Sequence, residues 1–224
     1  DRDFAAPVMI VQRADGKEVL VAGSKDGMLY ALDPDTKGKV LWQRRLGDGG
    51  ELGGIQYGMA TDGRLVYAPI SDADLATHTS DGSLNAVDLM TGKLVWRTPT
   101  PRDGCKGKED SCMNGILSPP VVMGDAVIVG AMDGVLRAYD KRNGRIFWSY
   151  DAVRSYTGVN GLEGKGGSFG MGGVTIAGDM MYVSAGTGTS GFAGLKGNVL
   201  LAFEIGAIER PQNSTASADV VKTR

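Results

Sequence analysis

The 224-residue sequence predicts an all-β fold, a β-propeller of four-stranded antiparallel blades. The first observation is a motif that recurs with the same spacing, Ala86-x-Asp88-x-x-Thr91-Gly92-x-x-x-Trp96 and Ala138-x-Asp140-x-x-Asn143-Gly144-x-x-x-Trp148; a third copy, Ala31 to Trp42, has one extra residue. The second is an Asp-Gly pair upstream of each copy, which is a turn signal between short alternating strands. The tryptophans lie 54 and 52 residues apart. A repeat of this length with such turns is typical of propellers.

Each period contains about four segments with strand-like alternation. We expect strands at 7–11, 18–23, 28–32 and 40–45; at 55–61, 65–70, 83–87 and 94–98; at 116–123, 126–131, 136–139 and 146–150; and at 169–177, 180–185 and 198–205. The last period resembles the others but never reaches a tryptophan, so its fourth strand is absent. The predicted blades are roughly 1–48, 49–100, 113–152 and 166–206, which together make a partial propeller over residues 1–206.

The residues that follow have a different composition. The stretch 207–224 is polar and contains Pro211, Asn213, Ser214 and Thr215. Such a stretch cannot bury enough apolar surface to offset the entropy of ordering it. We expect a disordered C-terminal tail.

Charge and hydropathy exclude two classes of partner. The net charge is −2, with 24 basic residues interleaved among 26 acidic ones, so we expect no nucleic-acid surface. No run of apolar residues is long enough to span a membrane. No signal peptide is visible, and the start, Asp-Arg-Asp-Phe, looks like the middle of a domain.

The two cysteines, Cys105 and Cys112, bracket the polar string CKGKEDSC, and the chain has a single histidine, His78. A zinc site or a C-x-x-C-H haem attachment therefore lacks its ligands. We expect a small disulfide-closed loop, which implies an oxidising compartment.

Several strings resemble a known family, the PQQ (pyrroloquinoline quinone) dehydrogenases, which are eight-bladed propellers with tryptophan-docking repeats. The strings are GGIQYGMATD at 53–62, DGVLRAYD at 133–140, VNG at 159–161 with Gly166-Gly167, and GNVLLAF at 197–203. Together they resemble the polyvinyl alcohol dehydrogenase branch. The resemblance implies that the chain is the C-terminal half of the propeller. It also implies that the closing blade takes its outer strand from the N-terminal part of the domain.

The resemblance implies a site with PQQ and calcium. In the family a cation from a Lys-Asn-Gly type of turn reaches the quinone oxygens, and Lys25-Asp26-Gly27 matches that turn. A cation there stabilises the reduced oxyanion. The alternative is an ordinary solvated turn lysine.

The family also places a catalytic aspartate ahead of that cation, in a string that Asp1-Arg2-Asp3-Phe4 resembles. Asp1 is the better match, as proton acceptor for the substrate hydroxyl and as calcium ligand; the alternative is a frayed terminal residue. Gly191-Phe192 matches a Gly-Trp pair that lines the cofactor, with a packed loop phenylalanine as the alternative. Ile55 and Ile116 stand where many relatives have Asn and Trp, which puts cofactor binding in doubt.

Two functions follow from the resemblance. One is a quinoprotein that oxidises secondary alcohols, polymeric alcohols among them, in the periplasm or outside a bacterial cell. Its electrons pass through PQQ to cytochrome c or a dye, and a haem c domain could lie elsewhere in the protein. Most calcium and PQQ ligands are expected in the N-terminal half. The alternative is a non-catalytic propeller scaffold for protein–protein interaction, of the outer-membrane assembly type.

Overall fold

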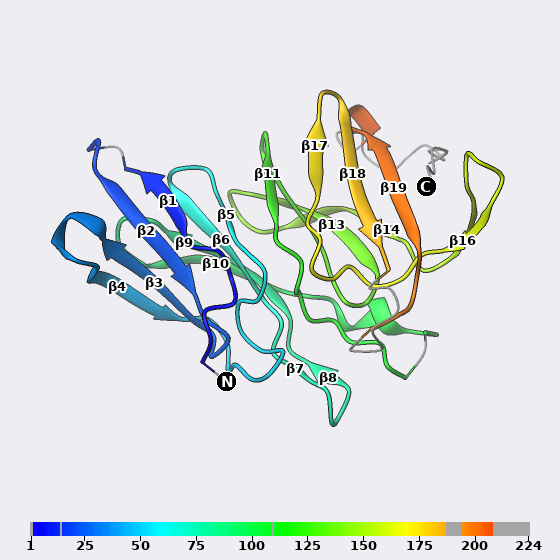
Figure 1. Ribbon diagram of the computed structural model, residues 1–224, viewed down its shortest axis with the longest axis horizontal. Helices are drawn as coiled ribbons and strands as arrows, with labels where there is room; N and C mark the ends of the chain where they lie inside the picture. Colours follow the sequence, from blue (N-terminus) through cyan, green and yellow to red (C-terminus); the bar gives the residue numbers. More distant parts are fainter. Residues whose placement is uncertain (1, 14, 109, 187–193, 208–224) are drawn as a thin grey trace.

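The computed structural model describes every residue except 1, 14, 109, 187–193 and 208–224, so the predicted tail lies outside the described residues apart from Ala207. The predicted fold class is confirmed. The described residues form three four-stranded antiparallel sheets and one three-stranded sheet, which follow one another along the chain (Figure 1). We call these sheets blades 1 to 4.

The strands of each blade follow the chain order. Blade 1 contains β1 (Met9–Gln12), β2 (Glu18–Gly23), β3 (Met28–Asp33) and β4 (Lys39–Arg45); blade 2 contains β5 (Ala60–Thr61), β6 (Leu65–Ile70), β9 (Ser83–Asp88) and β10 (Leu94–Pro99). Blade 3 contains β11 (Val121–Met123), β12 (Ala126–Gly130), β13 (Val135–Asp140) and β14 (Ile146–Asp151), and blade 4 contains β17 (Thr175–Ala177), β18 (Met180–Ala185) and β19 (Val199–Glu204). Short 3-10 helices cover Pro34–Thr36, Arg102–Cys105 and Ile205–Ala207.

Two short hairpins were not predicted. One consists of β7 (Ala73–Asp74) and β8 (Thr79–Ser80), and the other of β15 (Ser155–Thr157) and β16 (Glu163–Lys165). Their strands have two or three residues each, which is too short for an alternating pattern to stand out. The first strands of blades 2 to 4 begin later than predicted, at Ala60, Val121 and Thr175.

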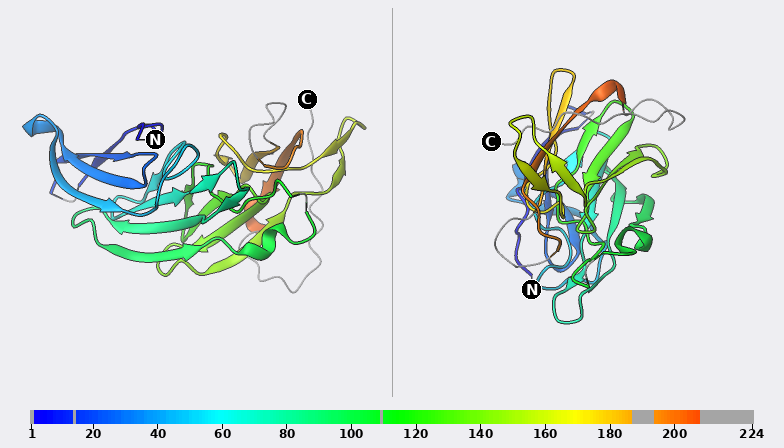
Figure 2. Two further views of the ribbon diagram at one scale, coloured as in Figure 1. Left: turned by 90° about the horizontal axis from the view of Figure 1, so that it is seen from below. Right: turned by 90° about the vertical axis from the view of Figure 1, so that its right-hand side faces the viewer.

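The blades lie along an arc, with blade 1 and blade 4 at its two ends (Figure 2, left). Alternating side chains of the facing strands fill the space between neighbouring blades. Three apolar clusters result, one for each pair of neighbours, and most of their members are fully buried. Burying each large aliphatic side chain contributes roughly 1.5–3 kcal/mol, so packing between blades holds the arc together.

Burial of the repeat tryptophans follows the prediction only for Trp96, which is 8% exposed. Trp42 and Trp148 are only half-buried. The difference in burial follows from the residue that lies in register with each tryptophan, two strands away in the same blade. The ring of Tyr67 lies against Trp96, with centroids 6.0 Å apart, whereas the residues in the same register of the other two blades are the smaller Val21 and Ile128.

In the part of the chain that the structure describes, no helix has the length and apolar character needed to cross a membrane.

Candidate functional site

One end of the blades gathers the connections that could form a site. In a four-stranded antiparallel blade, the turn between the second and third strands lies at the same end as the connection to the next blade. This end is the lower one in Figure 1, where the β7–β8 hairpin protrudes. We call it the loop rim.

Backbone hydrogen bonds tie the loop rim together from blade to blade. In each connection, one residue donates its N–H to the preceding blade, at or just after the end of that blade's second strand. The residue before it accepts an N–H from the turn after the second strand of its own blade. The donating bonds are Ile55 to Ser24 (3.1 Å), Ile116 to Ile70 (3.2 Å) and Phe169 to Ala131 (3.1 Å), and the accepting ones are Gly54 from Ser71 (3.0 Å), Gly115 from Met132 (2.9 Å) and Ser168 from Gly186 (2.9 Å). These bonds explain why the first strands begin late, because the residues ahead of them pair with turns instead of with a strand.

Lys25 lies on the loop rim, in the turn between β2 and β3. Its side chain is 15% exposed, and its Nζ lies 3.8 Å from Oδ2 of Asp3. Its backbone N–H donates to the carbonyl of Asp3 at 2.9 Å. The structure therefore brings the predicted cation and the N-terminal carboxylate string together, but the described carboxylate beside Lys25 belongs to Asp3.

Asp3 was missed as a site residue because the sequence offers two aspartates, Asp1 and Asp3, two positions apart, and the spacing to Lys25 does not choose between them. Asp1 lies outside the described residues, as do Gly191 and Phe192, so their placement stays a prediction.

The turn that carries Lys25 is supported by the connection between blades 1 and 2. Gly54 lies so close to this turn that a Cβ atom there would be 2.5 Å from the carbonyl oxygen of Lys25. Its φ of +60° also favours glycine. The carboxylate of Asp72 accepts backbone N–H bonds from Asp48 (2.8 Å), Gly49 (3.1 Å) and Gly54 (2.8 Å). Through these three charge-assisted hydrogen bonds, Asp72 holds in place the connection that packs against the Lys25 turn. The sequence did not predict this role.

Ile55 and Ile116 have a structural role. Both side chains are 0% exposed and belong to the apolar clusters between blades 1 and 2 and between blades 2 and 3. Phe169 occupies the matching position between blades 3 and 4. Because all three fill one recurring packing position, these isoleucines give no evidence for or against cofactor binding.

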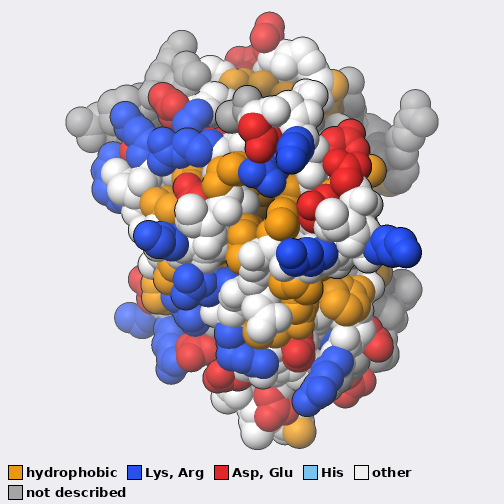
Figure 3. Space-filling model, turned by 90° about the vertical axis from the view of Figure 1, so that its left-hand side faces the viewer, with side chains coloured by type: hydrophobic (Ala, Val, Ile, Leu, Met, Phe, Trp, Pro, Cys, Tyr) orange, Lys and Arg blue, Asp and Glu red, His pale blue; other side chains and the backbone are white. Residues whose placement is uncertain are grey.

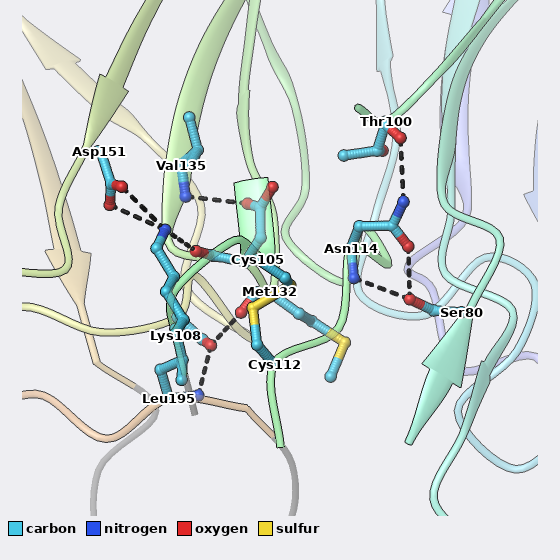
Figure 4. The surroundings of a disulfide bond; sticks show 12 residues. Ser80, Thr100, Cys105, Lys108, Cys112, Asn114, Met132, Val135, Asp151 and Leu195 are labelled. Atoms are coloured by element: carbon cyan, nitrogen blue, oxygen red, sulfur yellow. Dashed lines mark hydrogen bonds and ion pairs between the residues drawn. A yellow bond between two sulfur atoms is a disulfide. The ribbon is translucent and has the colours of Figure 1, made fainter. Parts of the chain in front are cut away.

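A disulfide-closed loop covers part of the loop rim at blade 3 (Figure 4). Cys105 and Cys112 are bonded, with Cα atoms 5.6 Å apart. Within this loop Lys108 donates from Nζ to the carbonyl of Asp133 at 2.7 Å and forms an ion pair with Asp151 at 2.9 Å. The loop is therefore held both by its covalent bond and by charge.

Nearby, Asn114 joins the β7–β8 hairpin to the connection that follows blade 2 (Figure 4). Its backbone N–H donates to Oγ of Ser80 at 2.8 Å, that hydroxyl donates to Oδ1 of Asn114 at 2.7 Å, and Nδ2 donates to the carbonyl of Thr100 at 2.9 Å. These hydrogen bonds therefore hold the β7–β8 hairpin in a fixed position at the loop rim.

The described residues do not by themselves hold a metal. No group of three or more His, Cys, Asp or Glu side chains in the described ranges is arranged to bind an ion. Asp3 and Lys25 can instead supply one carboxylate and one ammonium group to a polar ligand that lies beside them.

Comparison with known proteins places the chain in a family. The family model described as outer membrane protein assembly factor BamB matches residues 25–165 and 80–205. The polyvinylalcohol dehydrogenase of a Pseudomonas species is 37% identical over 198 residues, which covers 85% of this chain and 31% of that protein. The enzyme of the same name from Sphingopyxis sp. is 37% identical over 211 residues and covers 90% of this chain and 32% of its own length.

Solved structures show the same fold. Quinohemoprotein alcohol dehydrogenase ADHIIG from Pseudomonas putida has a TM-score of 0.64 at 18% identity, over 92% of this chain and 33% of that chain. The quinohemoprotein alcohol dehydrogenase of Comamonas testosteroni has a TM-score of 0.62 at 20% identity, over 91% and 33%. The chain thus spans about a third of the length of these relatives. It belongs to the PQQ-type propeller family described as outer membrane protein assembly factor BamB, and its predicted resemblance to the quinoprotein alcohol dehydrogenases, with the polyvinylalcohol dehydrogenases among them, is confirmed.

Proposed function

We propose that this chain is part of a PQQ-dependent alcohol dehydrogenase that oxidises secondary alcohols, polymeric alcohols among them. The observation that carries the proposal is the juxtaposition of Lys25 with Asp3 on the loop rim, with 3.8 Å between the ammonium and carboxylate groups. The 37% identity to two polyvinylalcohol dehydrogenases supports it.

In the proposed reaction, Lys25 and the carboxylate of the N-terminal string have different roles. PQQ, when bound, supplies a quinone that accepts a hydride from the alcohol carbon. Lys25 holds its positive charge beside the oxygen on which negative charge develops, which lowers the barrier because the charge is already in place. A carboxylate of the N-terminal string takes the proton of the substrate hydroxyl. At Asp3, the ion pair with Lys25 holds the carboxylate in place.

Calcium does not fit the described residues alone, because they bring together no set of ligands large enough for this ion. We assign its remaining ligands, and most PQQ contacts, to a part of the protein that precedes this chain. Residues 1–206 would then be the C-terminal half of an eight-bladed ring. Blade 4 supports this arrangement, since among the described residues β19 forms the edge of a three-stranded sheet where blades 1 to 3 have a fourth strand.

We infer a periplasmic or secreted bacterial protein, since the bond between Cys105 and Cys112 suits an oxidising compartment. Cytochrome c is the proposed electron acceptor, and a haem c domain would lie outside this chain.

The test uses the complete protein that contains this chain, reconstituted with PQQ and calcium. Lys25→Ala should lower turnover of a secondary alcohol with a dye acceptor by at least about a hundredfold, with the unfolding midpoint unchanged. Lys17→Ala is the matched control, because Lys17 is exposed between β1 and β2, at the opposite end of blade 1. Equal turnover in both variants would rule out the proposed role of Lys25.

A non-catalytic scaffold is the second candidate. The description of the matching family model favours it, as does the BamB of Burkholderia pseudomallei, 28% identical over 137 residues. Absence of PQQ binding by the complete wild-type protein would select the scaffold.

A further inference from the structure

The repeat places one aspartate in the turn that follows the second strand of blades 1, 2 and 3. These are Asp26, Asp72 and Asp133, and each lies two residues after the carbonyl that accepts the N–H of the next connection. Asp26 and Asp133 serve their own turns, since their Oδ1 atoms accept the backbone N–H of Met28 (3.3 Å) and of Val135 (2.9 Å). Such a bond from an aspartate to the residue two positions later is an ordinary way to close a turn.

Asp72 departs from this pattern. Its backbone has a φ of +42°, in the left-handed region where residues other than glycine are uncommon. The β7–β8 hairpin begins directly after it, where blades 1 and 3 have a tight turn. Its carboxylate accepts three backbone N–H groups of the connection between blades 1 and 2, those of Asp48, Gly49 and Gly54. Backbone strain of this kind persists only where the surroundings enforce it, and it clusters at functional sites.

The connection lies between Asp72 and the turn that carries Lys25. On its far side the N–H of Gly50 donates to the carbonyl of Lys25 at 3.2 Å. Gly49 is pressed against the same turn, because a Cβ atom there would lie 2.5 Å from Cα of Asp26. Such close backbone contact means that a displacement of the connection passes directly to the turn.

The position of the Lys25 ammonium depends on how this turn is held. Lysine has a flexible side chain with a four-carbon stem, and its Nζ lies 3.8 Å from Oδ2 of Asp3. Figure 3 shows acidic and basic side chains together at the lower end of the view, which is the loop rim of blade 1. Arg45 of this rim has its Nη2 atom 4.0 Å from Oδ2 of Asp26. In this mixture of charges, a loosened turn would let the ammonium move toward another carboxylate.

We propose that Asp72 is a positioning residue of the reaction, which acts through the connection between blades 1 and 2 on the turn of Lys25. The inference rests on the proposed function, in which Lys25 supplies the charge beside the quinone oxygen. A comparison within the repeat supports it, because the turn of blade 2 carries the uncharged Ser71 at the position of Lys25. The next aspartate, Asp133, pairs with Arg137 of its own blade. The aspartate that reaches across blades is thus the one that faces the charged turn.

The first test uses the complete protein that contains this chain, reconstituted with PQQ and calcium. Asp72→Asn removes the charge while asparagine tolerates a positive φ, so kcat for a secondary alcohol should fall by about tenfold or more. KM should stay nearly constant, because the charge of Lys25 acts on the transition state. Asp62→Asn is the matched control, since Asp62 accepts the N–H groups of Arg64 (3.0 Å) and Leu65 (2.8 Å) at the opposite end of blade 2. It should lower the melting temperature and leave kcat unchanged.

A double-mutant cycle separates positioning from folding. In the Lys25→Ala background, Asp72→Asn should cause no further loss of kcat, whereas its effect on the melting temperature should remain. An equal loss of kcat in both backgrounds, or none in the wild type, would overturn the positioning role and leave the proposed function intact. Full turnover in Lys25→Ala itself would instead overturn the proposed function, and this inference with it.

The second measurement needs no cofactor. Amide hydrogen exchange in the complete protein without PQQ should be several-fold faster at Gly50 and Ile55 in Asp72→Asn than in the wild type, because both N–H groups bond to the Lys25 turn. Asp62→Asn should leave both rates unchanged. Unchanged exchange at Gly50 in Asp72→Asn would refute the inference. Should the asparagine variant not fold, Asp72→Gly removes the carboxylate together with the strain, and the same outcomes apply.

Discussion

Asp133 and Arg137 form a buried ion pair beneath the disulfide-closed loop. Arg137 donates from its two terminal nitrogens to the two carboxylate oxygens, at 3.1 and 2.5 Å, and the side chains are 4% and 0% exposed. Gly104, the residue before Cys105, lies on this pair, since a Cβ there would be 2.1 Å from Oδ2 of Asp133. The ion pair is therefore shielded from solvent, so each of its buried charges depends on the other for compensation.

Breaking this pair should be costly. Arg137→Met leaves the Asp133 carboxylate buried with a hydrogen bond from the backbone N–H of Val135, and we expect a loss of about 3–5 kcal/mol in the free energy of unfolding. Arg102→Met is the control, because Arg102 pairs with Asp81 at 3.0 Å with both side chains well exposed; it should cost at most about 1 kcal/mol. Urea titration of both variants measures the difference, and equal costs would contradict the predicted burial.

The bond between Cys105 and Cys112 closes an eight-residue loop. Its removal in the double variant Cys105→Ser and Cys112→Ser should cost about 2–3 kcal/mol in the chain-entropy model. Reducing agent should destabilise the wild type by a similar amount and leave the double variant unchanged. Thiol titration of unreduced protein checks the bond directly, and two reactive thiols would show that it is absent.

Acid should weaken the turn after β13. Hydrogen bonds from the side chain and backbone of Arg142 lower the pKa of Asp140 to about 2. An unfolded aspartate has a pKa of about 3.9, so this carboxylate stabilises the fold above about pH 4. That contribution is lost as the pH falls toward about 2, because the unfolded chain takes up the proton first.

The Asp140→Asn variant should therefore be less stable than the wild type at pH 7, and the gap should close between about pH 4 and pH 2. Urea unfolding at a series of pH values measures this gap. Asp35→Asn serves as the control, since Asp35 is an exposed carboxylate in the matching turn of blade 1. A difference in stability between the two proteins that stays constant down to pH 2 would contradict the lowered pKa of Asp140.

Tryptophan burial predicts an order of stabilities. Trp96→Ala should cost about 3–5 kcal/mol, and Trp42→Ala less, because Trp42 keeps more contact with solvent and lacks a tyrosine beside its ring. Guanidinium unfolding of the two variants, at matched pH, gives the comparison. The reverse order would mean that the hydrogen bond to Leu89 outweighs the packing of Trp96.

The repeat could be predicted from the sequence because its turns and alternation are local. The strands from 18 to 23 and from 65 to 70 have the predicted bounds. The positions of Ile55 and Ile116 depend instead on bonds to the turns of a neighbouring blade, far away in sequence. A comparison of residue types alone took these isoleucines as departures that put cofactor binding in doubt, whereas burial between blades accounts for them. The support of Lys25 by Asp72 is equally non-local, across 47 residues, and has no sequence signal.

The N-terminal string offers the final prediction, which concerns the role of Asp3. Its carboxylate lies 3.8 Å from Nζ of Lys25. In the complete protein reconstituted with PQQ and calcium, we expect Asp3→Asn to lower turnover by at least about a hundredfold if Asp3 is the proton acceptor. Asp1→Asn should then have little effect, and the reverse result would return the role to Asp1. The pH profile separates catalysis from folding, because loss of a catalytic carboxylate removes the acid limb while the melting temperature stays the same. Loss of turnover together with a lower melting temperature would instead assign Asp3 to holding the Lys25 turn, to which its carbonyl is already bound.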